Sequence, residues 1–520
     1  MSLIAPKSHR VFFIIGLSLL AAALPFSLFA LSVAQFVLII NWFCEGNVLE
    51  RFKAFFRNKP ALIFSLFFVL HIIGLVYTTD FNYAFKDIRT KLPLLLLPLV
   101  LSTTAPLKRR ELNLIFSVFI AAVGVATVIS TFYYMNHQVK DIREVSRFIS
   151  HIRFSLMICM AVVLLAWYLG KQKGWSFWIY ILCAALLLWF LVFLTLFESV
   201  TGVAVLGVLL IFFTIKSLFK PVALYYKIAA VVLIVGFFIF SYLYVQQAAK
   251  EYFHKNMVDF STLEKYTAEG NPYLHDSTSL QSENGNLIWI YICKEELERE
   301  WKKRSAYDFN GFDDKNQLVQ YTLIRYMASK GLRKDALALQ SLRDDEIKAI
   351  EKGIPSVRFF EKMTLKKRIH EILWEYENYK KDGNANGLSV MLRVEFAKTA
   401  LGIIERHPVF GVGTGDVNMA FKEQYERRQS VLRPEYRWRS HNQYLSVCVA
   451  FGLAGFVVFI LSLFYPPLKT HAFSDGRYLA FFIIILVSML TEDTLETQAG
   501  VSFYAFFSAL FLFGVSKDNN

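Results

Sequence analysis

Long apolar runs separated by short polar connections make up most of the chain. A window of about 20 residues, the length that crosses a bilayer, finds roughly twelve such runs. They cover approximately residues 11–24, 26–43, 61–77, 92–102, 112–134, 152–169, 175–196, 199–215, 222–245, 442–465, 478–490 and 501–515. The pattern predicts an all-α, polytopic helical membrane protein with about 12 transmembrane helices.

Prolines interrupt two parts of this pattern. Pro25 separates the first two runs, which therefore form either two helices or one broken hairpin. Pro93 and Pro98 fall within the short fourth run. Because proline removes a helical hydrogen bond, we expect an irregular or tilted element there.

A long polar segment, residues 246–441, separates the ninth run from the tenth. Apolar residues recur in it at helical spacing, and Gly331 and Gly353 act as stop signals, so the segment is predicted to be helical. The predicted helices cover residues 294–304, 317–329, 344–352 and 357–379. We therefore divide the chain into a membrane domain of about nine spans, a large loop domain and a membrane domain of about three spans, at residues 1–245, 246–441 and 442–520.

Lysine and arginine cluster in alternate connections between the runs. Such clusters mark the cytoplasmic loops of membrane proteins. They lie at residues 51–59, 108–110, 171–173 and 216–220. Both termini are therefore predicted to be cytoplasmic, and the large helical loop to be extracytoplasmic.

Two connections on the predicted outer side also carry cations. One holds Lys86, Arg89 and Lys91, and the other holds Lys140, Arg143 and Arg147. Either acidic neighbours such as Asp87 and Asp141 neutralise these cations, or the cations bind a ligand. Arg153, just inside the sixth run, is the cation to which the neutralising explanation applies least.

Composition excludes a soluble domain and gives no sign of a metal or cofactor. Hydrophobic residues make up 55% of the chain, and the mean hydropathy is +0.41. The net charge of +14 comes from short basic clusters between apolar runs, which membrane orientation explains better than nucleic-acid binding. The five cysteines form no CxxC pair and no disulfide framework.

The loop ends in an unusually basic segment, Tyr425–Leu445, which holds five arginines and His441 beside the tenth run. Cations on the outer side of a membrane oppose the usual distribution, so they indicate a function. Their charge favours an anionic ligand such as a lipid-linked phosphate. For Arg433, Arg437 and Arg439, contact with such a ligand and contact with anionic lipid remain alternatives.

An amphipathic helix and a glycine-rich turn precede the basic segment. In residues 388–406 an apolar stripe predicts a helix that either lies on the membrane or packs within the loop domain. Residues 407–416 read HPVFGVGTGD, which lacks the Gly-Lys-Ser/Thr ending and the preceding strand of a phosphate loop. We therefore expect a tight loop beside the membrane and no nucleotide site.

These segments resemble a known family. RVEFAKTALGIIERHPVFGVGTGD and the later SHNQYLSVCVAFGLAGFVVFI resemble the core signature of the O-antigen ligase and O-antigen polymerase superfamily of bacterial membrane glycosyltransferases. DIRTKLPLLLLPLVL and SHIRFSLMICM resemble earlier segments of the same family. The resemblance covers most of the chain except the middle of the large loop.

The resemblance implies an enzyme of the bacterial inner membrane whose site faces the periplasm. It would transfer a glycan from an undecaprenyl-diphosphate carrier to a glycan or lipid acceptor, without metal, cofactor or nucleotide sugar. An O-antigen ligase is the first expectation. A polysaccharide polymerase and a protein O-glycosyltransferase are alternatives within the superfamily, and a transporter or flippase for an anionic lipid-linked substrate is the non-enzyme alternative.

The family's site residues map onto this chain by position. His441 matches the family histidine and is the candidate base or acceptor-orienting group, with Asn442 and Tyr444 in support. Arg153 and Arg393 match arginines expected to bind the diphosphate, and we add Arg437 and Arg439 of the basic segment as further candidates.

One departure from the family pattern affects the predicted donor site. Many relatives have Ser-Arg-Thr-Gly at the start of the eighth span, whereas this chain has Ser199, Val200, Thr201 and Gly202. An arginine is therefore missing at Val200. Either another cation replaces it, or the donor pocket differs.

The predicted topology can be tested with fusions. A reporter that is active only outside the cytoplasm should work when fused near Lys315, in the large loop, and should fail near Arg109, in a basic connection. The opposite pattern would place the candidate site in the cytosol, away from any periplasmic substrate.

Overall fold

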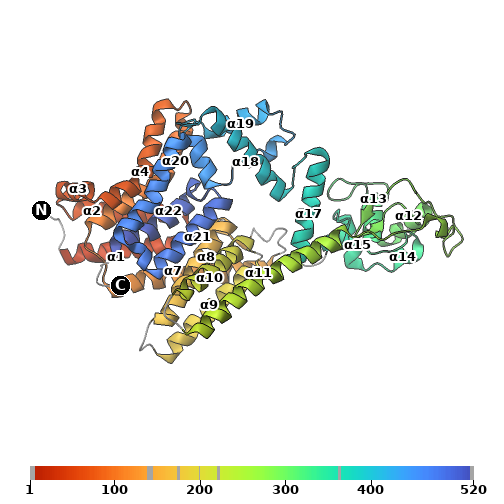
Figure 1. Ribbon diagram of the computed structural model, residues 1–520, viewed down its shortest axis with the longest axis horizontal. Coiled ribbons are helices and arrows are strands. Elements are labelled where there is room, and N and C mark those ends of the chain that lie inside the picture. Colours follow the sequence, from red (N-terminus) through yellow and green to blue (C-terminus); the bar gives the residue numbers. More distant parts are fainter. Residues whose placement is uncertain are drawn as a thin grey trace. The chain divides into compact units, whose positions relative to one another are not determined.

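The computed structural model describes residues 6–137, 145–171, 176–197, 199–219, 223–360 and 365–515 (Figure 1). Lys140, Asp141 and Arg143 of the second outer connection lie outside these residues. Helices are the dominant regular structure of the described residues, and β1 (Ser282–Glu283) and β2 (Asn286–Leu287) form a two-stranded antiparallel pair. The predicted all-α fold class is confirmed.

The chain divides into two compact units, Met1–Lys227 with Asn384–Asn520, and Ile228–Gly383. The predicted loop domain, residues 246–441, is therefore shared between them. Its last part, from Asn384, belongs to the same unit as the apolar helices. All of the candidate site residues lie in this first unit.

The first unit contains the apolar helices other than most of α11, together with the segments that connect them. Before the second unit its helices are α1 (Pro6–Ala23), α2 (Leu28–Cys44), α3 (Val48–Arg57), α4 (Lys59–Ile73), η1 (Gly74–Tyr77), α5 (Phe81–Lys91), α6 (Pro93–Thr103), α7 (Arg109–Asn136), α8 (His151–Lys171), α9 (Phe177–Leu196), α10 (Val200–Leu218) and the start of α11 (Leu224–Phe253). After it they are α18 (Ser389–Arg406), α19 (Val417–Arg427), η4 (Pro434–Tyr436), α20 (Gln443–Thr470), η5 (Ala472–Ser474), α21 (Gly476–Thr491), η6 (Thr494–Glu496), α22 (Gln498–Ala509) and the π-helix η7 (Leu510–Gly514).

Within the described residues, seven helices are long and apolar enough to cross a membrane, or up to eight if the bent pair α2 and α3 is one span. The prediction of about twelve counted shorter runs as well. Those runs form shorter helices such as α6, α21 and α22, in part because proline or polar turns end them early. The chain is a multi-pass membrane protein.

Pro25 separates two helices, as one of the alternatives from the sequence has it, whereas the irregular element expected at Pro93 and Pro98 is a continuous α-helix. Pro25 lies in the turn between α1 and α2, which are two separate helices packed against each other. Pro93 begins α6, where no amide hydrogen is needed, and Pro98 lies inside this helix of 11 residues.

Helix α20 is interrupted at Gly452, and the glycine-rich turn forms hydrogen bonds with the backbone on both sides of the interruption. The amides of Val412 and Gly413 donate to the carbonyls of Val449 and Ala450, at 3.0 and 2.8 Å. In return, the amides of Leu453 and Ala454 donate to the carbonyls of Pro408 and Val409, at 2.8 and 3.1 Å. Backbone groups that the break would leave unpaired in an apolar span are thus satisfied by the loop.

Glycine is required at this crossing because two backbones touch. Gly452 has φ 61° and ψ −164°, a conformation that is essentially restricted to glycine. A Cβ atom there would lie 2.3 Å from the carbonyl carbon of Val409. Gly411, with φ 69°, faces the same constraint, since its Cβ would lie 2.4 Å from the carbonyl carbon of Ala450. The predicted tight loop is therefore explained by this contact.

The same turn fixes the start of α5. Asp416 accepts hydrogen bonds from the amides of Thr79 and Asp80, at 2.9 and 2.8 Å to the nearer oxygens. Thr414 Oγ1 donates to the carbonyl of His71 at 2.7 Å, at the end of α4. The segment that carries the family signature is thus attached to both α4 and α5.

Helix α18 packs inside the unit by its apolar stripe. Phe396, Ala400 and Ile403 are buried, and the helix contacts α19 and α20. The sequence allowed a helix that lies on the membrane or one that is packed against other helices. The buried apolar face agrees with a packed helix.

The second unit is a helical domain with its own core. Its elements besides β1 and β2 are most of α11, η3 (Phe260–Thr262), α12 (Lys294–Arg304), α13 (Val319–Ser329), α14 (Ala336–Gln340), α15 (Asp344–Glu351), α16 (Val357–Phe360) and α17 (Leu365–Asp382). Trp301, Leu323, Met327 and Ile350 belong to its buried apolar cluster. The helices agree closely with those predicted, and Gly331 and Gly353, both at φ 70°, follow α13 and α15 as the expected stops.

We expect Gly452→Ala to destabilise the protein by about 3 kcal/mol or more, because a Cβ both strains the backbone and pushes the two crossing segments apart. Gly207→Ala is the matched control, since nothing lies within 4 Å of its added Cβ in α10. Thermal unfolding of both variants in detergent would test this. Equal unfolding temperatures would contradict the role given to the crossing.

Candidate functional site

Four segments of the first unit meet at the candidate site. They are the first turn of α8 with Arg153, the first turn of α18 with Arg393, the start of α20 with His441, and the turn that joins α21 to α22. The last of these contributes three acidic residues, Glu492, Asp493 and Glu496.

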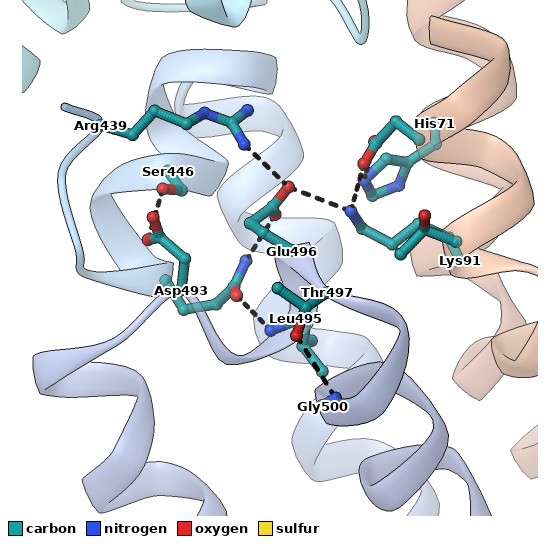
Figure 2. Close-up of polar contacts among 12 residues, drawn as sticks. His71, Lys91, Arg439, Ser446, Asp493, Leu495, Glu496, Thr497 and Gly500 are labelled. Atoms are coloured by element: carbon teal, nitrogen blue, oxygen red, sulfur yellow. Dashed lines mark hydrogen bonds and ion pairs between the residues drawn. The ribbon is translucent and has the colours of Figure 1, made fainter. Parts of the chain in front are cut away.

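The acidic turn is held in place by one glutamine of α20. The Gln443 side chain accepts a hydrogen bond from the amide of Leu495 at 2.7 Å and donates to Glu496 Oε1 at 3.1 Å. Thr497 then caps α22 by accepting from the amide of Gly500 at 3.4 Å (Figure 2). The carboxylates are thus fixed by the backbone of the turn as well as by their partners.

Glu492 is the point at which three predicted site residues converge. Its carboxylate lies 3.9 Å from Arg393 Nη2 and 4.0 Å from His441 Nδ1. Burial raises the pKa of Glu492, while His441, Arg153 and Arg393 each act to lower it through their charge. Residues far apart in the sequence therefore share one electrostatic centre.

His441 is held in a constrained position between the basic segment and α20. Its φ of 47° places it in the left-handed region, and its ring lies 5.5 Å from that of Phe396. The next residue, Asn442, caps α20 by accepting from the amide of Leu445 at 3.0 Å. Asn442 also donates to the carbonyl of Leu490 at 2.9 Å, beside the acidic turn.

Tyr444 contributes to this arrangement from one residue further into α20. Its hydroxyl donates to the carbonyl of Leu486 in α21 at 3.2 Å. Asn442 and Tyr444 thus tie the start of α20 to α21 at two points. The supporting role predicted for the pair around His441 stays a prediction.

The two arginines beside Glu492 differ in exposure. The Arg393 side chain is 51% exposed and reaches the carboxylate only at 3.9 Å. Arg153 is largely enclosed, and its Nε is a buried nitrogen with no hydrogen-bond partner among the described residues. A buried donor without an acceptor is costly, and an anionic ligand would satisfy it.

Arg439 belongs to a second, adjacent group of charges. Its Nη1 lies 3.5 Å from Glu496 Oε2, and its guanidinium lies over the ring of Tyr83, 5.5 Å from the centroid. Its Nε has no hydrogen-bond partner among the described residues. Figure 2 shows this side chain and Lys91 approaching Glu496 from different elements.

Lys91 completes that group from the end of α5. Its Nζ lies 2.6 Å from Asp87 Oδ1 and 3.0 Å from Glu496 Oε2, and the side chain is fully buried. Burial would raise the pKa of Glu496, but the charges of Lys91 and Arg439 outweigh it and hold that pKa below its usual value. His71 Nε2 lies 3.6 Å from the other oxygen of Asp87.

Asp493 is held by hydroxyl groups, and no ion pair to it is found among the described residues. Ser446 donates to its Oδ1 at 2.8 Å, and Ser440 lies 2.8 Å from Ser446. Burial raises the pKa of Asp493, and the charge of Glu496 raises it further. The turn therefore combines Glu496, whose pKa is held down by its cations, with Glu492 and Asp493, whose pKa values are raised by burial.

The structure does not bring Arg437 to this centre. Its Nε donates to the carbonyl of Leu432 at 2.9 Å, its Nη2 to that of Ser430 at 3.4 Å, and its guanidinium lies over the ring of Tyr425. These contacts shape the basic segment itself. Arg433 is exposed.

Sequence reasoning missed the acidic partners of the site. Glu492, Asp493 and Glu496 follow the predicted span 478–490, and three carboxylates at its outer end were a usable signal. For Lys91 the neutralising explanation is confirmed, because Asp87 is its closest partner. Lys86 and Arg89 are exposed.

Comparison with protein families identifies part of the chain. The O-antigen ligase family matches residues 347–460, which include Arg393, Arg439 and His441. This segment of the chain is therefore similar to the O-antigen ligase family. Its resemblance to that superfamily is confirmed, and the family implies a ligase-type membrane enzyme that acts on a lipid-linked glycan and an acceptor. A search of curated proteins gives no match.

Arg153 and Glu492 lie outside the matched residues, yet Glu492 lies 4.0 Å from His441 and interacts electrostatically with Arg153. Val200, where the resemblance led us to expect an arginine, is exposed at the start of α10. Across the described ranges, no group of three or more His, Cys, Asp or Glu side chains could hold a metal ion.

Proposed function

We propose that this protein transfers a glycan from an undecaprenyl-diphosphate carrier to an acceptor on the periplasmic face of a bacterial inner membrane. The observation that carries the proposal is the convergence of Arg153, Arg393 and His441 on the single carboxylate of Glu492. A ligase-like reaction needs cations for a diphosphate and a base for a hydroxyl at one place. This arrangement supplies both.

The arginines account for binding of the donor. Arg393 is half exposed and loosely paired, and Arg153 has an unsatisfied buried Nε, so both have donors to offer a diphosphate. Guanidinium groups bind phosphate oxygens in pairs and stabilise the negative charge that grows as the leaving group departs. Arg439, with its own unsatisfied Nε, lies beside them through the acidic turn.

His441 accounts for activation of the acceptor. The acceptor oxygen attacks the anomeric carbon, the bond from that carbon to the diphosphate oxygen breaks, and the hydroxyl proton passes to the imidazole. Because Nδ1 faces Glu492, the other ring nitrogen, Nε2, is the one left for the acceptor. The carboxylate then stabilises the imidazolium that forms.

The reaction in this proposal uses no metal, because arginines take the place that a divalent cation holds in many enzymes that act on diphosphates. The identity of the acceptor separates a ligase from a polymerase or a protein O-glycosyltransferase. Surface glycans of a deletion strain would show unligated chains, short chains or unglycosylated protein respectively.

We expect His441→Ala to lower turnover by about 10²-fold or more while binding of undecaprenyl diphosphate is kept, because the arginines bind it without the imidazole. His407→Ala is the matched control, since His407 is exposed. Glycan transfer by purified protein, with and without EDTA, is the measurement. Near-normal turnover of the His441 variant would exclude it as the base, and loss of activity in EDTA would contradict a metal-free reaction.

We expect Arg153→Ala and Arg393→Ala each to weaken donor binding by about tenfold or more, with lysine restoring only part of it, because lysine keeps the charge but loses the planar fork. Arg427→Ala is the control, since Arg427 pairs with Glu423 on the exposed side of α19. Titration with undecaprenyl diphosphate measures the effect. Unchanged affinity in both alanine variants would overturn the proposed donor site.

A further inference from the structure

Two cations, Lys91 and Arg439, lie near the same oxygen of Glu496. Lys91 Nζ lies 3.0 Å from Oε2, and Arg439 Nη1 lies 3.5 Å from the same atom. Only the lysine is within hydrogen-bond distance with good geometry, and the guanidinium remains at the longer distance. Lys91 therefore takes the stronger contact, and Arg439 is left with the weaker one.

The other oxygen of Glu496, Oε1, is also not available as an acceptor for Arg439. Oε1 accepts from Gln443 Nε2 at 3.1 Å. The orientation of that amide is fixed, because its own oxygen accepts from the amide of Leu495 at 2.7 Å. The carboxylate cannot turn toward the guanidinium without breaking one of these bonds.

Arg439 consequently keeps unused donors beside the candidate site. Across the described part of the chain it makes no hydrogen bond that meets distance and angle limits, and its Nε is buried without a partner. The ring of Tyr83 lies against the guanidinium, with its centroid 5.5 Å from Cζ. The guanidinium of Arg439 is therefore held in place, while some of its N–H groups make no hydrogen bond.

Lys91 is itself firmly held. Asp87 binds its Nζ at 2.6 Å, one turn earlier on α5, and Asp416 fixes the start of the same helix. The side chain has no exposed surface, so it cannot reach a ligand directly. Any effect of Lys91 on the reaction has to pass through its partners.

We propose that Lys91 is a positioning residue, which occupies Glu496 so that the guanidinium of Arg439 stays available to the diphosphate of the donor. The inference rests on the proposed function, because it assigns Arg439 to donor binding. Without Lys91, the cation that lies nearest to the buried carboxylate of Glu496 would be Arg439, at 3.5 Å. A buried carboxylate without a partner is strongly unfavourable, so the arginine would close onto it and be lost to the ligand.

The test removes the lysine without leaving Asp87 charged and unpaired. The pair variant Lys91→Met with Asp87→Asn takes away one positive and one negative charge and keeps similar volumes. We expect it to bind undecaprenyl diphosphate about tenfold more weakly, with a matching rise in donor KM and a much smaller change in kcat.

The decisive comparison adds Glu496→Gln to the pair variant. The triple variant no longer has the carboxylate that captures Arg439, so affinity for undecaprenyl diphosphate should return to within about threefold of the original protein. A purely structural role for Lys91 predicts the reverse, with the triple variant no better than the pair variant. That result would overturn the proposal, as would unchanged affinity in the pair variant.

A further variant separates this inference from the function on which it rests. Arg439→Gln in the otherwise unchanged protein should weaken binding of undecaprenyl diphosphate about tenfold. If it does not, Arg439 is no donor ligand and the assignment of its function is wrong. If it does, while the triple variant shows no recovery, only the role of Lys91 is wrong. Unfolding temperatures of all variants identify any that fail to fold.

Discussion

Compensation of charge at the turn between α21 and α22 is the constraint on which the candidate site depends. Three carboxylates in a short buried turn would be prohibitively unfavourable alone. They draw cations from α5, α8, α18 and the start of α20, segments that are distant in sequence. These contacts do not use every hydrogen-bond donor of the cations. The balance leaves donors at Arg153 and Arg439 that the protein itself does not use.

The carboxylates also divide the site into two parts with different roles. Glu492 faces the groups that we assign to the reaction, His441 and Arg393, at distances near 4 Å. Glu496 is bound closely by Lys91 and Gln443 and belongs to the rigid interior. A ligand can replace the loose contacts of Glu492 without disturbing the tight contacts of Glu496, and a binding site needs such an arrangement.

The sequence was sufficient for the helical fold and for several element boundaries. Apolar periodicity predicted α12 at residues 294–304, and glycine signals predicted the ends of α13 and α15. The resemblance to a family named Arg153, Arg393 and His441, which the structure brings to one carboxylate. It could not reveal Glu492 or Lys91 as partners, since pairing across α5, α8 and α21 depends on packing. Nor could it separate Arg437, which binds its own segment, from Arg439, two residues later.

The crossing between the glycine-rich turn and α20 has a consequence for biogenesis. Until residues 408–413 dock, the opened backbone at Gly452 would expose amides and carbonyls to lipid. Until α20 is present, the turn has no partner for its own amides. Stable integration of this span and docking of the preceding turn are therefore one cooperative event. The candidate site can form only after both segments have been synthesised. Its assembly is therefore a late step in the maturation of the protein.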